Sequence, residues 1–134
     1  MSQWTHVNGS LRVDAFRIPG MQSPTLNLGI QASYAADHEP AFIPYGSEGS
    51  LVWTKWDNPD KSCMAAYTVN VFGDLRDYDS IKEIEAYMDQ LVKGQMIRSG
   101  VFEVSVERGL TNVYRFDNVL SKWELVSTVL YKEE

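Results

Sequence analysis

The residues that could support nucleophilic catalysis are few and lie far apart in the chain. Cys63 is the only cysteine, and His6 and His38 are the only histidines. A nucleophile needs a base within hydrogen-bond reach, whereas Cys63 begins a stretch that predicts a buried strand. The serines offer no Gly-x-Ser-x-Gly elbow, because Gly46-Ser47-Glu48-Gly49-Ser50 only looks similar and lacks the strand-to-helix context. We therefore predict no catalytic residue.

Acidic side chains cluster without forming a metal-binding motif. Asp74, Asp77 and Asp79 resemble a carboxylate cluster, but the Asp-x-Asp-x-Asp-Gly calcium pattern is absent. Asp37-His38-Glu39 offers three ligand types, yet neighbours in a chain seldom point at one ion. Asp77 and Asp79 precede a predicted helix, where carboxylates favour the positive end of the dipole. The sequence therefore predicts no metal site and no cofactor.

Arginine and aromatic side chains form the one pattern that suggests a ligand. Neither a Walker sequence nor Gly-x-Gly-x-x-Gly occurs, but arginine forks match phosphates and aromatic faces stack on bases. Arg76 is notable inside the acidic turn, although an ion pair with Asp74 or Asp77 would also explain it. The candidate ligand-binding residues are Arg12, Arg17, Trp53, Trp56, Arg76, Tyr78 and Arg115.

Length and composition indicate a single domain over residues 1–134. The chain is 44% apolar and 22% charged, which is ordinary globular usage. Its net charge of −6 argues against general nucleic-acid binding. A lone cysteine excludes an intrachain disulfide. No signal peptide is visible, and no apolar run reaches the roughly 18 residues of a membrane span, so we expect a cytoplasmic protein without membrane contact.

The first half of the chain predicts two β-hairpins separated by an arm. Residues 3–17 predict an N-terminal hairpin, because Asn8-Gly9 is a strong type I′ turn signal. Residues 19–50 are punctuated by proline and glycine and predict an ordered arm with one or two short strands. Residues 51–56 and 62–72 predict the second hairpin. Both faces of its second strand are largely apolar, which predicts a central strand covered on two sides.

A helix and further strands follow. The apolar residues Ile81, Ile84, Met88 and Leu91 recur at helical spacing and predict one main helix over about 79–97. With the preceding hairpin and the next strand it makes a β-α-β core at 51–108, and residues 112–132 supply the C-terminal strands. The expected fold class is α+β, an antiparallel sheet of about six to seven strands with this helix packed on it.

Three stretches of the chain, residues 4–14, 46–50 and 72–78, resemble small phage- or prophage-encoded proteins of uncharacterised type. Phage proteins of this size often act as stoichiometric antagonists of host immunity, including nuclease inhibitors and sponges for cyclic-nucleotide signals. The resemblance therefore implies a counter-defence protein that acts in the host cytoplasm. It assigns no role to any residue of this chain.

We therefore expect a non-enzymatic binding or inhibitory protein. It would sequester a nucleotide-type immune signal, or present its acidic turn and helix to a host defence protein. Homo-oligomerisation is expected, because one helix cannot cover both apolar faces of the central strand. Two alternatives remain, a phage structural or assembly protein, and a small metal-dependent hydrolase or phosphodiesterase using Asp74, Asp77, His6 and His38.

Overall fold

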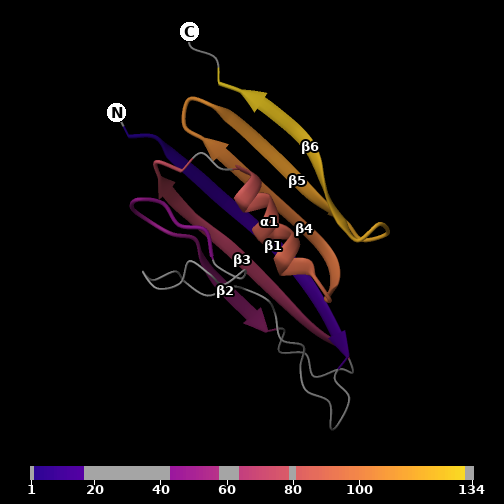
Figure 1. The fold of residues 1–134 in the computed structure, drawn as a ribbon. Coiled ribbons are helices and arrows are strands. Elements are labelled where there is room, and N and C mark those ends of the chain that lie inside the picture. The colour runs from indigo at the N-terminus through magenta and orange to yellow at the C-terminus, as the bar shows by residue number, and fades with distance from the viewer. Residues whose placement is uncertain (1, 17–42, 58–63, 79–80, 132–134) are drawn as a thin grey trace.

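The computed structural model describes residues 2–16, 43–57, 64–78 and 81–131. Within these ranges, six strands form one antiparallel sheet in the order β2-β3-β1-β4-β5-β6, with one helix (Figure 1). The predicted α+β class is confirmed, with six strands in the described part of the chain. The elements are β1 (Trp4–Phe16), β2 (Val52–Asp57), β3 (Met64–Arg76), α1 (Ile81–Val92), β4 (Met96–Val106), β5 (Leu110–Asp117) and β6 (Lys122–Leu130).

The N-terminal segment is one long strand at the centre of the sheet, so the predicted hairpin at residues 3–17 is wrong. β1 pairs with β3 on one side and with β4 on the other. Gly9 lies opposite Phe102 of β4, and a Cβ atom added to Gly9 would lie 2.5 Å from that aromatic ring. Gly9 therefore makes room for Phe102, whose side chain is fully buried. This packing across strands overrides the local turn signal of Asn8-Gly9.

The second predicted hairpin is present, because β2 pairs antiparallel with β3. Its second strand differs from the prediction in one respect. Tyr67, Val69 and Val71 of β3 are buried on the helix side, whereas Asn70 and Phe72 are exposed on the other side, Phe72 to 40%. The expectation of a central strand covered on both faces is therefore wrong.

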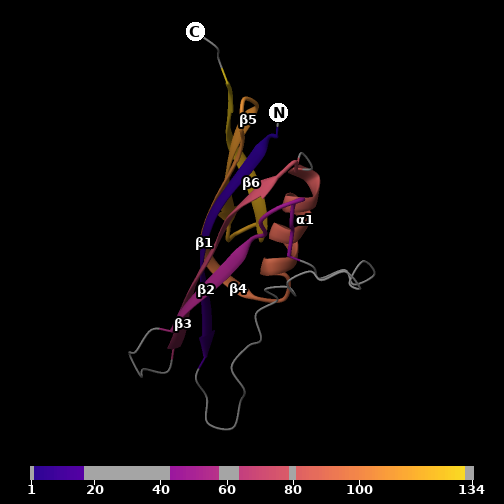
Figure 2. The same cartoon turned by 90° about the vertical axis from the view of Figure 1, so that its left-hand side faces the viewer.

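The helix packs one buried stripe against the sheet and is shorter than predicted. Ile84, Met88 and Leu91 of the predicted stripe are buried, together with Tyr87. α1 ends at Val92 rather than near residue 97, because Gly94 adopts a positive φ of 73° and β4 begins at Met96. Figure 2 shows α1 on one side of the sheet. With a length of 12 residues, it is too short to span a membrane, and no described helix is long and apolar enough to do so.

The glycine-rich segment at residues 46–50 docks against the end of β3. Ser47 donates its backbone N–H to the carbonyl of Arg76 at 3.0 Å, and Arg76 donates its own to the carbonyl of Glu48 at 2.9 Å. A Cβ atom on Gly46 would clash with the backbone of Arg76, so glycine allows this close approach. Ile43 and Leu51 are buried beside it. The rest of the predicted arm, residues 19–42, lies outside the described residues.

The predicted C-terminal strands are present as β5 and β6, which pair antiparallel as a hairpin, with β6 at the edge of the sheet. Asp117 ends β5, and its Oδ1 accepts hydrogen bonds from the backbone N–H groups of Val119 and Leu120. These two bonds hold the pKa of Asp117 below its ordinary value. The register shifts by one residue after Leu125, which leaves Val126 without a paired residue on β5. Such a bulge increases the local twist of an edge strand.

Replacing Gly9 with alanine tests the packing of Phe102 on β1. The added methyl group must displace the ring, so the free energy of unfolding should fall by about 1–3 kcal/mol. Phe102→Leu on the same background makes room for the methyl group. The two changes together should therefore cost less than the sum of the single changes. Urea unfolding of the four proteins measures this coupling, and strictly additive costs would contradict the proposed contact.

Candidate functional site

The face of the sheet opposite α1 is mostly polar, and no helix or strand in the described part of the chain covers it. Cross-strand partners share a face, so the register places His6 beside Asp74 and Ser105, and Ser10 beside Asn70 and Val101. We call this surface the open face. Figure 2 shows no described element packed on it. Strand by strand it carries Thr54 and Trp56 of β2, Asn70, Phe72 and Asp74 of β3, His6, Asn8, Ser10 and Arg12 of β1, Val101, Glu103 and Ser105 of β4, Val113 and Arg115 of β5, and Glu124 and Val129 of β6.

The open face brings together three of the predicted ligand-binding residues. Arg12 and Trp56 both lie opposite Thr68 of β3, which separates them by two strand spacings. Arg115 lies in the next row, two strands from Ser10. Trp53 is on the helix side of β2, as expected from its three-residue spacing to Trp56, and both tryptophans are exposed. Arg17 lies outside the described residues.

The arginines of the open face are already engaged with carboxylates. Arg12 Nε lies 3.1 Å from Asp14 Oδ1, and Arg98 contacts the second oxygen of that nearly buried carboxylate at 3.3 Å. Arg115 lies 3.6 Å from Glu124. A nucleotide phosphate would have to displace these carboxylates. The arrangement therefore offers aromatic surface for a ligand more readily than free positive charge.

Arg76 and Tyr78, the remaining predicted ligand residues, hold the end of β3 in place. Arg76 pairs with Glu48 at 3.0 Å and lies 3.8 Å from Asp77, in agreement with the ion-pair interpretation for Asp77. Tyr78 is buried, and its hydroxyl donates to Glu83 at 2.8 Å. Its carbonyl accepts the Thr5 hydroxyl. The described contacts of both residues therefore serve packing of the turn.

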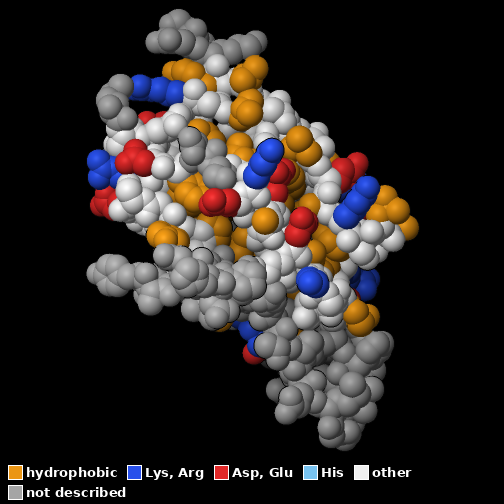
Figure 3. Space-filling view, viewed as in Figure 1, with side chains coloured by type: hydrophobic (Ala, Val, Ile, Leu, Met, Phe, Trp, Pro, Cys, Tyr) orange, Lys and Arg blue, Asp and Glu red, His pale blue; other side chains and the backbone are white. Residues whose placement is uncertain are grey.

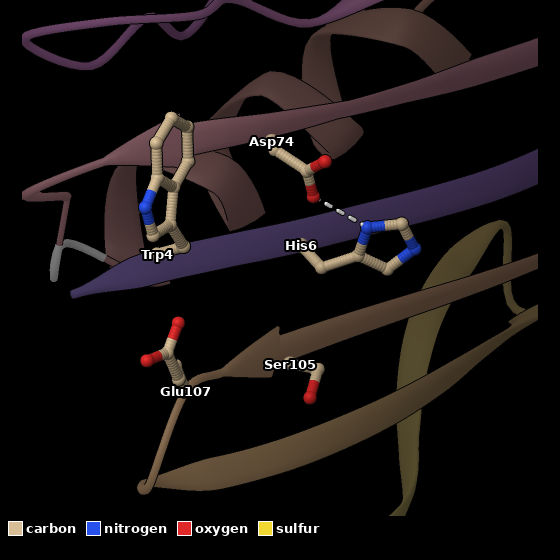
Figure 4. A pocket seen from close by; sticks show the side chains of 5 residues that line it. All are labelled: Trp4, His6, Asp74, Ser105 and Glu107. Carbon is tan, nitrogen blue, oxygen red and sulfur yellow. Dashed lines mark hydrogen bonds and ion pairs between the residues drawn. The ribbon is translucent and has the colours of Figure 1, made fainter.

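A shallow hollow of about 450 Å³ opens where β1, β3 and β4 meet. It is lined by Trp4, His6, Asp74, Ser105 and Glu107 (Figure 4). His6 Nδ1 lies 2.6 Å from Asp74 Oδ1, and both side chains are more than half exposed. A carboxylate accepts hydrogen bonds, so His6 donates its Nδ1–H to Asp74. His6 and Asp74 were predicted only as candidate residues of the alternative hydrolase. Their direct contact was not predicted from the sequence.

The hollow lacks the remaining parts of a nucleophilic site. Ser105 follows His6 in the cross-strand row, but its hydroxyl points away from the imidazole (Figure 4) and hydrogen-bonds Thr111 at 2.8 Å. Asp77 does not join the pair, because its Oδ2 accepts the Ser47 hydroxyl and its Oδ1 the Gln3 N–H. Those bonds tie Asp77 to the N-terminal segment and to the glycine-rich segment at residues 46–50. In the described ranges, no group of three or more His, Cys, Asp or Glu side chains could hold a metal ion; His38 lies outside them.

A second hollow, of about 330 Å³, lies between α1 and the β5–β6 hairpin, and sequence reasoning missed it. Tyr114 and Trp123 form an aromatic wall, and Glu85 and Asp89 supply two carboxylates from one helix face. Their spacing of four residues was the signal available in the sequence. We call this hollow the acid–aromatic pocket, and its lining residues are Glu85, Met88, Asp89, Tyr114, Trp123 and Leu125.

The walls of the acid–aromatic pocket are fixed by hydrogen bonds. Trp123 donates its Nε1–H to the carbonyl of Met88 at 3.0 Å. The Tyr114 hydroxyl donates to Glu85 at 3.0 Å, and burial together with Glu85 raises the pKa of Tyr114 to about 12. Burial, followed by repulsion from Glu85, raises the pKa of Asp89. The pocket therefore holds two carboxylates whose negative charges repel each other.

Comparisons with known proteins give no relative from which a function could be transferred. No family model matches the chain, no match was found among the curated proteins, and no solved structure matches.

Replacing Asp74 with alanine tests the hydrogen bond in the hollow. At pH 8.5, where an imidazole is neutral, we expect His6 as the Nδ1–H tautomer in the unmodified protein. Asp74→Ala removes the acceptor and should shift His6 toward the Nε2–H tautomer. Long-range ¹H–¹⁵N correlation spectra distinguish the two forms. Asp57→Ala, an exposed carboxylate on β2, is the control, and an unchanged tautomer in Asp74→Ala would exclude the contact.

Replacing Asp89 with asparagine tests the repulsion in the acid–aromatic pocket. A carboxyl group whose pKa is raised by folding opposes folding wherever it is ionised in both states. Asp89→Asn should therefore stabilise the protein by about 0.2–0.5 kcal/mol at pH 7. The gain should shrink as the pH falls through the ordinary aspartate pKa of about 3.9 and disappear near about pH 2.5, where the carboxyl group is protonated in both states. Urea unfolding at the two pH values measures the effect, and a loss of stability at pH 7 would contradict it.

Proposed function

We propose that this protein is a non-enzymatic binding protein that captures an extended segment of a partner protein at the free edge of β6. The observation that supports the proposal is the uncharged, exposed stretch at residues 125–131. Exposed edge strands with apolar side chains are templates for pairing with another chain, and partner strands bind to such edges in several recognition modes.

The side chains of this stretch are exposed on both faces of the sheet. Five large apolar residues are 49–66% exposed, and the β5–β6 turn adds Val119 and Leu120. Figure 3 shows hydrophobic side chains along the β6 side of the molecule. Apolar patches of this kind mark interaction surfaces when they are contiguous. The five residues are Leu125, Val126, Val129, Leu130 and Tyr131.

The backbone of β6 also presents hydrogen-bonding groups outward. Tyr131 donates its N–H inward, to the carbonyl of Gly109 at 3.0 Å. Because these groups alternate in direction along a strand, Leu130 and Thr128 direct theirs away from β5. In the described part of the chain, β5 is the one strand that pairs with β6. The outer edge can therefore accept one more strand.

The opposite edge of the sheet is less suited to capture. β2 has 6 residues against 9 in β6, and it carries Lys55 and Asp57. Lys55 covers the ring of Tyr67 at 4.2 Å and pairs with Asp57. Short edges with lysine are common protection against strand addition. The contrast favours β6 as the binding edge.

A partner-capturing edge suits an antagonist that blocks a host defence protein, the role implied by the resemblance to phage-encoded proteins. We keep the nucleotide sponge as a second candidate, because Trp56, Arg12 and Arg115 share the open face. The pairing of both arginines with carboxylates ranks it below protein capture.

A selection from a displayed library of random nonapeptides tests strand capture, since β6 has 9 residues. We expect enrichment of alternating apolar peptides that bind the protein but bind Leu130→Pro at least about tenfold more weakly than Leu130→Ala. Proline removes an outward N–H without breaking the β5 ladder, and alanine removes the same side chain while keeping that N–H. Fluorescence anisotropy measures the affinities.

The fold of both variants is checked by circular dichroism, and sedimentation velocity reports self-association. Enriched peptides that bind the two variants equally, or a selection without enrichment, would exclude capture at β6. A stable dimer that Leu130→Pro dissociates and Leu130→Ala retains would instead show that a second copy of this chain occupies the edge.

A further inference from the structure

The acid–aromatic pocket opens next to the edge at which a partner strand would pair. Trp123 and Leu125 line the pocket, and both belong to β6. Trp123 faces the helix side, where it packs edge-on against Phe102 and Phe116. A strand added to β6 would lie about 4.8 Å beyond it. Every second side chain of that strand would point to the helix side, toward the mouth of the pocket.

The chemistry of the pocket favours a cation. Glu85 and Asp89 approach the same space from α1, and the ion pairs of the described residues include neither of them. The register places the β6 neighbours of the pocket, Lys122 and Glu124, on the open face. Burial, followed by repulsion from Glu85, raises the pKa of Asp89, so a cation placed beside the two carboxylates would favour the ionised form of Asp89.

The aromatic wall adds to this preference. Lysine and arginine side chains stack their charged groups on tryptophan and tyrosine and lay their aliphatic stems on apolar surface. Trp123 and Tyr114 supply the rings, and Leu125 supplies an apolar lip between the edge and the carboxylates. An acidic side chain in the same place would meet two like charges.

We infer that the acid–aromatic pocket receives a lysine or arginine side chain from the partner strand that pairs with β6, an inference that rests on the proposed strand capture. The recognised segment is then an extended, apolar stretch of a protein with one basic residue on its helix-side face. β6 supplies backbone pairing, and the pocket selects for the basic residue.

The peptides selected on the unmodified protein test this inference. We expect a lysine or arginine at one fixed position in the enriched nonapeptides. A peptide with arginine there should bind about tenfold more tightly than the same peptide with citrulline, the uncharged isostere, as expected for charge-assisted bonds. The Glu85→Gln/Asp89→Asn double variant should bind both peptides within about twofold of each other.

Glu124→Gln is the matched control, because it removes a carboxylate from β6 itself, on the face of the sheet opposite the pocket. It should keep the preference for arginine over citrulline. Peptides that bind at β6 without a basic position, or a preference that survives the double variant, would overturn the pocket assignment and leave strand capture intact. Equal binding to Leu130→Pro and Leu130→Ala would remove both, so the two failures are distinguishable.

Discussion

One short helix has to cover one face of a six-stranded sheet. α1 has 12 residues, so it is about 18 Å long and about 10 Å wide, while the outer strands lie about 24 Å apart at ordinary spacing. The helix therefore buries the middle of the sheet, where Val7, Leu11 and Phe102 are nearly inaccessible. Among the described residues, the opposite face, the β6 edge and the pocket beside the helix are left uncovered. These three surfaces are exposed because one short helix is too small to cover the sheet, and not because of any catalytic motif.

The sequence predicted those parts of the fold that depend on local periodicity. The buried stripe of α1 and the antiparallel pairing of residues 52–57 with 64–76 follow from the spacing of apolar residues and a turn signal. The turn signal at Asn8-Gly9 gave a wrong prediction for the same reason. The turn preference of these two residues is local, whereas Phe102, whose packing against Gly9 overrides it, lies far along the chain. Both faces of β3 were expected to be covered, because the face opposite Val69 and Val71 includes the apolar Phe72. The ring of Phe72 is nevertheless partly exposed.

The candidate sites depended on register, which a single sequence does not contain. Arg12, Trp56 and Arg115 share a face only because β1 lies between β3 and β4. His6 and Asp74, separated by 68 positions, become neighbours for the same reason. Glu85 and Asp89 are four residues apart on α1, and the fold, not their spacing, brings Tyr114 and Trp123 to the same pocket. The arginines that suggested an anion site pair with carboxylates: Arg12 with Asp14 on its own strand, Arg76 with Glu48 of the glycine-rich segment, and Arg115 with Glu124 of β6.

The central position of β1 has a consequence for how the chain reaches this structure. β1 is synthesised before every other described strand, but Thr5 pairs with Leu75 on one side and Val106 on the other. The sheet cannot close around it until most of the chain has emerged from the ribosome. Pairings between distant residues make folding slow, and a long strand with one apolar face is prone to aggregation while it waits for its partners. The strand that organises the finished molecule is therefore its most vulnerable part during synthesis.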